Sequence, residues 1–141
     1  MSPGSATAVA LMFVWLGMLL AISFLEAPLK FWAPGVTLPI GLGIGRLVFR
    51  ALNSTEAVLA VGILIGLAIG HSPVRVIVAS AIVFAALAAQ LLVVRPRLAR
   101  RSDAVLAGQI APRSRAHYAY VALEVVKVIG LAAGGILLLS S

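Results

Sequence analysis

The sequence predicts an all-α integral membrane protein, a bundle of four transmembrane helices with an amphipathic interfacial helix after the first. Hydrophobic residues make up 62% of the 141 residues and charged residues only 11%, whereas a soluble domain carries about 25% charged residues. The mean hydropathy is +1.16. A helix crosses a bilayer with about 20 apolar residues, and four apolar stretches of about this length form a single transmembrane domain over residues 1–141: 6–27, 55–71, 74–94 and 115–139.

The first helix is expected over about residues 6–27, and Pro28 ends or kinks it because proline removes a backbone hydrogen bond. No Lys or Arg precedes its apolar run, so it lacks the basic region of a secretory signal and is expected to stay as a span. Residues 37–52 follow, with Arg46 and Arg50 four residues apart on one helical face. This spacing predicts an amphipathic helix at the membrane interface. The alternative is the first part of a long second helix.

Small residues recur at intervals of four in the second and third helices. Asn53 followed by Glu56 resembles a capping box, which predicts that the second helix begins near residue 55. Ridges of small residues let two helix backbones approach closely. We therefore expect helices 2 and 3 to form a tight hairpin, with dimerisation through one ridge as the alternative. The ridge residues are Gly62, Gly66 and Gly70 in helix 2 and Ala81, Ala85 and Ala89 in helix 3.

Basic residues are concentrated in two of the predicted loops. The loop over residues 95–115 carries six arginines and one aspartate, and the loop after helix 1 carries Lys30, Arg46 and Arg50. The loops on the other side carry only Arg75. The positive-inside rule then predicts a multi-pass protein of the cytoplasmic (inner) membrane, with both basic loops in the cytoplasm and both termini outside. The net charge of +7 is therefore expected to meet anionic lipid rather than nucleic acid.

The fourth helix contains two ionisable residues near the middle of the bilayer. Glu124 and Lys127 lie about 14 and 18 Å beyond Arg115 at 1.5 Å per residue, and a charge at that depth indicates a functional site by default. His117 and Tyr120 fall within about 80° of them on one helical face. These four residues are candidates for ligand or proton binding or for intramembrane pairing. Alternatively, Glu124 and Lys127 only neutralise each other at i, i+3.

A second acid–base pair is predicted at the cytoplasmic end of helix 1. Glu26 and Lys30 are spaced i, i+4 in the favourable order, and with Arg46 they are a candidate clamp between helices. His71 and His117 are expected at opposite ends of the bundle, about 30 Å apart, so neither a metal site nor a cofactor is predicted. Cysteine is absent. The chain has no recognisable catalytic motif such as G-x-S-x-G or H-E-x-x-H, and it is not expected to be an enzyme.

Several short motifs resemble a family of small bacterial membrane proteins related to transmembrane protein 205. The similarity implies a four-helix bundle in the cytoplasmic membrane and no settled activity. Lys127 lies outside the family's pattern, and Glu124 occupies a position where a polar amide is more usual. The residues that carry the resemblance are Trp15, Gly17, Phe24, Ala27-Pro28, Phe31, Gly45, Phe49, Asn53, Pro96 and Arg115 to His117.

Three functions fit these observations. The first is an accessory or scaffolding subunit that joins a larger membrane complex, or a homo-oligomer, through its small-residue faces. The second is a carrier or binding protein for a small lipophilic or ionic substrate, in which Glu124 and Lys127 respond to the ligand. The third and weakest is a redox subunit that holds haem or quinone near His117.

Overall fold

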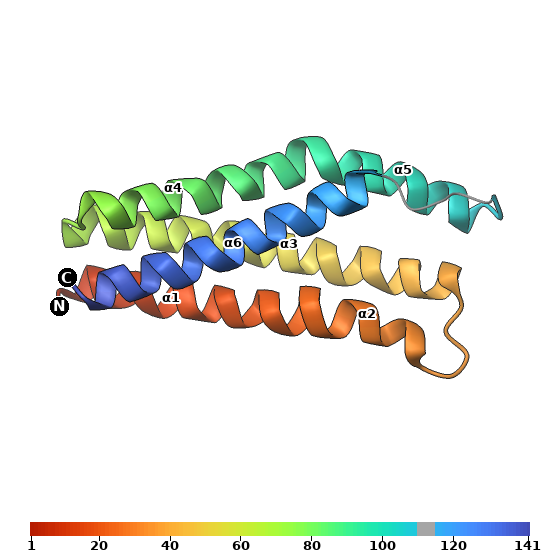
Figure 1. The fold of residues 1–141 in the computed structure, drawn as a ribbon, viewed down its shortest axis with the longest axis horizontal. Helices are drawn as coiled ribbons and strands as arrows, with labels where there is room; N and C mark the ends of the chain where they lie inside the picture. Colours follow the sequence, from red (N-terminus) through yellow and green to blue (C-terminus); the bar gives the residue numbers. More distant parts are fainter. Residues whose placement is uncertain (110–114) are drawn as a thin grey trace.

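The computed structural model describes residues 1–109 and 115–141, which form a bundle of long helical runs (Figure 1). Four runs are long and apolar enough to cross a membrane: Pro3–Trp32, Leu38–Gly70, Val74–Leu106 and Arg115–Leu139. The prediction of an all-α, multi-pass four-helix bundle is thereby confirmed. Both termini lie at one end with the turn at 71–73, and the connection at 33–37 lies at the other (Figure 1). We call these the terminal end and the loop end.

Two of the four runs change from α-helix to π-helix part-way along. The first comprises α1 (Pro3–Leu19), the π-helical η1 (Leu20–Glu26), α2 (Ala27–Leu29) and the 3-10 turn η2 (Lys30–Trp32). The third comprises α4 (Val74–Ala89), the π-helical η3 (Gln90–Val94) and α5 (Arg95–Leu106). Both π segments lie on the loop-end side of the α-helix that they follow (Figure 1).

Each π segment ends two residues before a proline, Pro28 in one run and Pro96 in the other. Proline has no N–H, and its ring clashes with the carbonyl four residues earlier, so a regular α-helix cannot continue through it unchanged. The backbone widens instead: the N–H of Ala27 bonds the carbonyl of Ile22, and the N–H of Arg95 bonds that of Gln90. The helices continue past both prolines. Of the two outcomes predicted for Pro28, an end or a kink of the helix, the helix therefore does not end there.

The second run is one uninterrupted helix, α3 (Leu38–Gly70). Thr37 caps it, because its side chain accepts a 3.4 Å hydrogen bond from the N–H of Ile40. Asn53 and Glu56, expected to cap a new helix, are instead buried in its interior. The prediction of a separate interfacial helix over residues 37–52 was therefore wrong, and the alternative of a long second helix was right.

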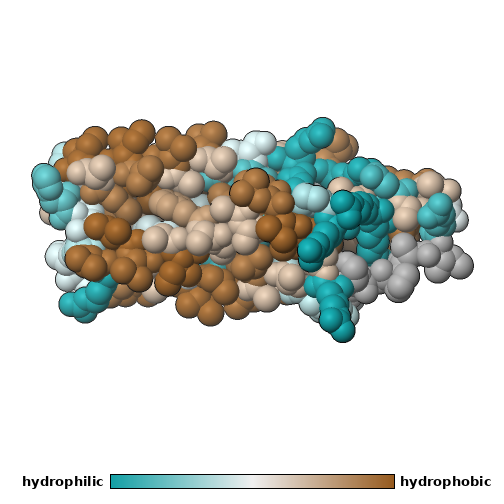
Figure 2. Space-filling model, turned by 90° about the horizontal axis from the view of Figure 1, so that it is seen from above, coloured by the Kyte–Doolittle hydropathy of each residue, from teal (hydrophilic) through white to brown (hydrophobic). Residues whose placement is uncertain are grey.

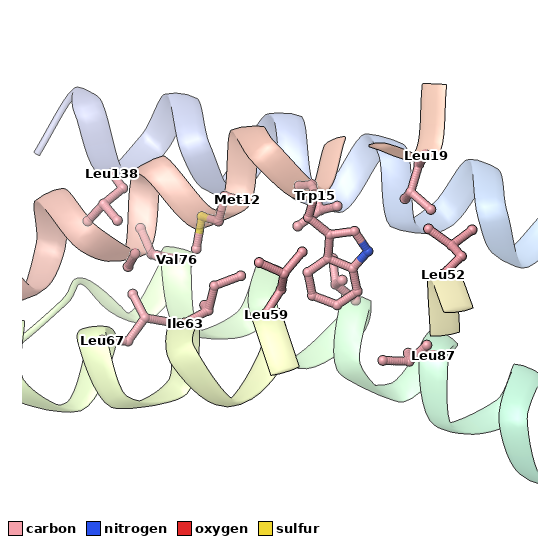
Figure 3. Close-up of a cluster of buried hydrophobic side chains, with 13 residues drawn as sticks. Met12, Trp15, Leu19, Leu52, Leu59, Ile63, Leu67, Val76, Leu87 and Leu138 are labelled. Carbon is pink, nitrogen blue, oxygen red and sulfur yellow. The ribbon is translucent and has the colours of Figure 1, made fainter. Parts of the chain in front are cut away.

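The fourth run is α6 (Arg115–Leu139), and the closest helix pairs are α1 with α3, α4 with α6, and α1 with α6. Side chains from all four runs meet in one buried core (Figure 3). Trp15 lies at the middle of that core, and its indole nitrogen points away from Met12 and Ile63 (Figure 3). Its ring also stacks on Phe84, with ring centroids 6.4 Å apart. This tryptophan is therefore a core residue rather than part of an interfacial belt.

The glycine ridge of α3 packs against α1 and not against α4. A Cβ on Gly66 would lie 2.8 Å from the carbonyl oxygen of Gly4, and one on Gly62 would lie 2.7 Å from Cδ1 of Leu11. On α4, Ala81 and Ala85 are exposed and Ala89 is half-buried. The predicted hairpin of helices 2 and 3 was wrong because α4 turns a different face inward, one that packs on α6: Val76, Ala79, Val83 and Ala86.

The surface divides along the length of the bundle. Hydrophobic side chains dominate the view from the terminal end past the middle, and hydrophilic ones gather toward the loop end (Figure 2). At 1.5 Å per residue, α3 is about 50 Å long, against a hydrocarbon thickness of about 30 Å. A helix of this length tilts, or extends beyond the hydrocarbon at one end, and the polar surface places any such extension at the loop end.

Candidate functional site

Five polar side chains, one or two from each helical run, meet at the centre of the bundle. They are buried to the same degree, and none is more than 2% exposed. Lys127 lies midway along α6, about 18 Å from either end. We call this group the central cluster; it consists of Trp15 of α1, Glu56 of α3, Gln90 of η3, and Glu124 and Lys127 of α6.

Lys127 contacts both acidic residues of the central cluster. Its Nζ contacts Oε2 of Glu56 and lies 2.6 Å from Oε1 of Glu124. The predicted pairing of Glu124 with Lys127 is therefore present, and Glu56 is a second acidic partner that the sequence did not indicate. Trp15 Nε1 donates a 2.8 Å hydrogen bond to Oε2 of Glu56. These contacts join α1, α3 and α6 in the interior.

Gln90 joins the fourth run to the cluster. Its Nε2 donates to Oε1 of Glu124 at 2.8 Å and to the backbone carbonyl of Tyr120 at 3.2 Å. The hydroxyl of Tyr120 donates to Oδ1 of Asn53 at 3.4 Å. Its ring meets Phe49 edge-on, with centroids 5.8 Å apart. A chain of hydrogen bonds therefore runs from the cluster toward the loop end.

The central cluster holds two acids and one base. With all three ionised it carries one net negative charge, and an uncompensated charge in a dry interior is costly. Oε1 of Glu56 and Oε2 of Glu124 are buried, and no described residue makes a hydrogen bond to either. Two carboxylate oxygens are thus available to a proton or to another positive group.

A cavity of about 630 Å³ lies on the loop-end side of the cluster. This volume is typical of pockets for small ligands, about 300–1,000 Å³. Glu124 and Tyr120 lie where the cavity meets the cluster, and aromatic and aliphatic side chains form much of its wall. The apolar lining includes Phe24, Ala27, Phe31, Leu42, Leu47, Phe49, Leu98 and Val121.

Basic side chains line the cavity in excess. Of the four acidic residues in the chain, only Glu124 is part of the lining that the structure describes, against five lysines and arginines: Lys30, Arg46, Arg50, Arg95 and Arg101. The cavity is therefore apolar in its walls and electropositive overall.

Only part of the predicted clamp is present. Nζ of Lys30 lies 3.9 Å from Oε2 of Glu26, the expected i, i+4 pair. The ion pair of Arg46 is with Asp103, at 2.6 Å, rather than with Glu26. Asp103 lies in α5, so this pair joins α3 to α5, a contact that no pattern in the sequence indicated.

The two histidines lie at opposite ends of the bundle, as expected. His71 ends α3 at the terminal end with a left-handed backbone, φ 52°, and His117 lines the cavity in the first turn of α6. Its ring meets that of Tyr118 edge-on, with centroids 5.6 Å apart. Within residues 1–109 and 115–141, no group of three or more His, Cys, Asp or Glu is placed to hold a metal ion.

Of the five residues of the central cluster, the sequence indicated only Glu124 and Lys127 as an intramembrane site. Asn53 and Glu56 were assigned to a helix start that does not exist, because α3 is continuous from Leu38 to Gly70. Gln90 had a usable signal, because it is an amide inside the apolar stretch 74–94. Glu56 was missed because the second helix was expected to begin near residue 55. Since α3 begins at Leu38, Glu56 lies inside the helix and is a third ionisable residue within a membrane-spanning run, after Glu124 and Lys127.

Comparison of the chain with known protein families, with curated proteins and with solved structures gives no match. The features of this protein that bear on its function are therefore the central cluster and the cavity.

Proposed function

We propose that this protein binds, and carries within the membrane, a small amphipathic anion. The observation that supports this best is the loop-end cavity of about 630 Å³, with an apolar wall and five basic side chains against one acid. An acyl or aromatic body fits the apolar wall, and an anionic head group is attracted by the basic side chains. Inward-facing ionisable residues at the inner end of the cavity are typical of transport paths.

Arg50 and Arg95 are the best candidates for the head group. Arg46 is already paired with Asp103, and Lys30 lies near Glu26. Arg95 donates to the backbone carbonyl of Phe49 at 3.4 Å, which holds its guanidinium at the cavity. A guanidinium group offers several donors in a plane and suits carboxylate, sulfonate or phosphate oxygens.

The same proposal includes an orientation. The loop end carries the excess of Lys and Arg, so the positive-inside rule puts it in the cytoplasm and both termini outside, in a cytoplasmic membrane. Anionic lipids would then surround the mouth of the cavity. Cysteine accessibility to a membrane-impermeant reagent tests this: Ser141→Cys should react in intact cells, and Ser102→Cys only after the cells are opened. The reverse pattern would overturn the orientation.

Binding can be tested with a decanesulfonate that carries a photoreactive diazirine, because a sulfonate stays anionic at all working pH values. In phosphatidylcholine nanodiscs, labelling of the protein should saturate, unlabelled decanesulfonate should compete, and labelled peptides should map to the cavity lining. Gly43 lines the cavity, and no atom lies within 4 Å of a Cβ built on it. Gly43→Phe should therefore fill the cavity and weaken labelling at least about tenfold.

Gly17→Phe is the matched control for this experiment. A Cβ on Gly17 also meets nothing within 4 Å, but this residue is exposed on α1 away from the cavity. The control should label like the wild type. Unsaturable labelling of the wild type, or equal labelling of Gly43→Phe, would overturn the proposed function.

An accessory-subunit role is the second candidate, and the exposed ridge of α4 supports it. Ala81 and Ala85 lie on the surface, where a close-packing partner helix can approach. Native mass spectrometry of protein released from its own membranes separates the candidates. A defined extra polypeptide would favour the subunit role, and a reproducible anionic small molecule would favour binding. A bound haem or quinone would instead favour the redox hypothesis at His117.

A further inference from the structure

We propose that Glu124 is a proton-binding site coupled to the anion in the cavity, so that each anion binds together with one proton. This inference rests on the proposed function. Glu124 is the one acidic side chain among the described residues that line the cavity, and it also belongs to the central cluster. It is therefore placed to sense both the ligand and the buried charge.

The groups around Glu124 leave one of its oxygens available. Oε1 accepts from Gln90 and from Lys127, at 2.8 and 2.6 Å. Oε2 is buried, and no described residue makes a hydrogen bond to it. A carboxyl group that gains a proton there keeps its existing contacts through Oε1 and becomes a donor through Oε2.

The titratable and charged groups around Glu124 come from three of the four runs. On α6 they are Lys127 and the hydroxyl of Tyr120, on α3 the carboxylate of Glu56, and on α5 the guanidinium of Arg95, which lines the same cavity. The first run contributes Trp15, an uncharged donor to Glu56. Lys127 is shared between two carboxylates, so its single charge compensates only one of them.

An anion in the cavity shares a confined space with Glu124. Two negative charges in a poorly hydrated site repel strongly, and protonation of Glu124 removes that repulsion. Linkage then requires the reciprocal effect: the anion favours the protonated form, and the proton favours the anion-bound form. Affinity for the anion should therefore rise as pH falls.

Glu124 and Glu56 differ in access to the ligand. Glu56 is fully buried and does not line the cavity, and its Oε2 is held by Lys127 and Trp15. Proton exchange with a ligand or with water in the cavity is open to Glu124 alone of the two. Glu56 then remains the constant partner of Lys127 while Glu124 changes charge.

The test measures saturation labelling by the photoreactive decanesulfonate in nanodiscs from pH 5 to pH 8. The sulfonate does not titrate there, so any change of affinity comes from the protein. Wild type should bind more tightly as pH falls, by up to about tenfold per pH unit for one linked proton. Glu124→Gln should bind with an affinity that is flat across this range and at least equal to that of the wild type at low pH.

Two further variants locate the proton. Imidazole side chains titrate in the same range, and His117 lines the cavity, so His117→Gln must retain the pH dependence. Glu56→Gln leaves Lys127 to Glu124 alone, so in this variant the pH dependence should move to lower pH. Loss of the pH dependence in His117→Gln, its movement to higher pH in Glu56→Gln, or its persistence in Glu124→Gln would overturn the assignment.

A second readout is the carbonyl stretch of a protonated carboxyl group in infrared difference spectra on addition of decanesulfonate. The band should appear in wild type and be missing in Glu124→Gln. Saturable wild-type labelling without pH dependence would overturn the proton coupling alone, whereas absence of saturable labelling at every pH would overturn the proposed function itself. Sodium-dependent binding at constant pH would also contradict a proton site.

Discussion

The two halves of the bundle are built from the same four helical runs but differ in packing. In the terminal half, glycines allow close contact: Gly4 lies against Gly66, and Gly130 and Gly134 meet residues of α4. In the loop half, the first and third runs widen into π segments, and a cavity of about 630 Å³ lies among the runs. The central cluster lies at the boundary.

The sequence thus produces close helix packing in the terminal half and a cavity of ligand size in the loop half. Pro28 and Pro96 follow the two π segments: η1 lies on the loop-end side of Trp15, and η3 begins at Gln90 of the cluster and extends toward the loop end. The cavity lining comes from residues 23–31, 41–53, 95–102 and 117–124, all on that same side. π segments are rare and are frequently found at functional sites, and here they lie beside the cavity.

The largest effect is expected at the boundary itself, for Lys127→Met. The substitution keeps much of the side-chain volume but leaves Glu56 and Glu124 buried without a cation. Removing one partner of a buried pair costs about 3–5 kcal/mol. Unfolding in mixed micelles with increasing dodecyl sulfate, followed by circular dichroism, measures this loss.

Arg75→Met is the matched control for the loss of a cation, because Arg75 is exposed near the terminal end. It should change the free energy of unfolding by no more than about 0.5 kcal/mol. Adding Glu56→Gln and Glu124→Gln to Lys127→Met removes all three charges and should restore part of the stability. A triple variant no more stable than Lys127→Met would contradict the charge argument.

Trp15→Phe should have the next largest effect. It keeps an aromatic ring in the core and removes the indole N–H that donates to Glu56 at 2.8 Å. A hydrogen bond to a charged group contributes about 1.5–3 kcal/mol. In the same unfolding measurement, Trp32→Phe is the control, because Trp32 is 83% exposed. Equal losses in the two variants would show that the hydrogen bond contributes nothing.

The sequence predicted the fold better than it predicted the pairing of helices. Four apolar stretches were enough to predict the bundle, because the length and hydropathy of a membrane span depend on that segment alone. Which helices touch depends on which face of each turns inward, and a ridge of small residues fits either a partner inside the chain or one outside it. This is why Gly66 was assigned to α4 although it packs on α1.

The site was predicted in part for a similar reason. Glu124 and Lys127 stood out because they share one face of an apolar helix, a pattern visible within α6. Glu56 and Gln90 approach them from α3 and η3, across 34 to 71 residues of sequence. Such contacts follow from tertiary packing, which no local pattern specifies. The cavity likewise arises from the arrangement of four runs.

Gly66→Ala tests the close packing of the terminal half. A Cβ at this position would lie 2.8 Å from the carbonyl oxygen of Gly4 and 3.2 Å from Cβ of Ala8, so α1 and α3 must move apart. Overpacking of this kind costs about 1–3 kcal/mol. Gly17→Ala gains the same helix propensity, up to about 1 kcal/mol, with nothing within 4 Å. A Gly66→Ala variant as stable as Gly17→Ala would refute the close contact.

The smallest effect is expected at Ala85, and here the neighbouring residue makes the comparison sharp. Ala85 is exposed and Ala86 is 5% exposed, although both lie in the same turn of α4. Ala86→Leu should cost about 1–3 kcal/mol by overpacking the core, and Ala85→Leu should change stability by no more than about 0.5 kcal/mol.

Native mass spectrometry of the stable Ala85→Leu variant then tests whether the outer face of α4 binds another polypeptide. If a polypeptide partner present on the wild type is lost from this variant, the outer face of α4 is an interface. If the variant retains an anionic ligand, the result favours anion binding in the cavity over a subunit role for the outer face of α4.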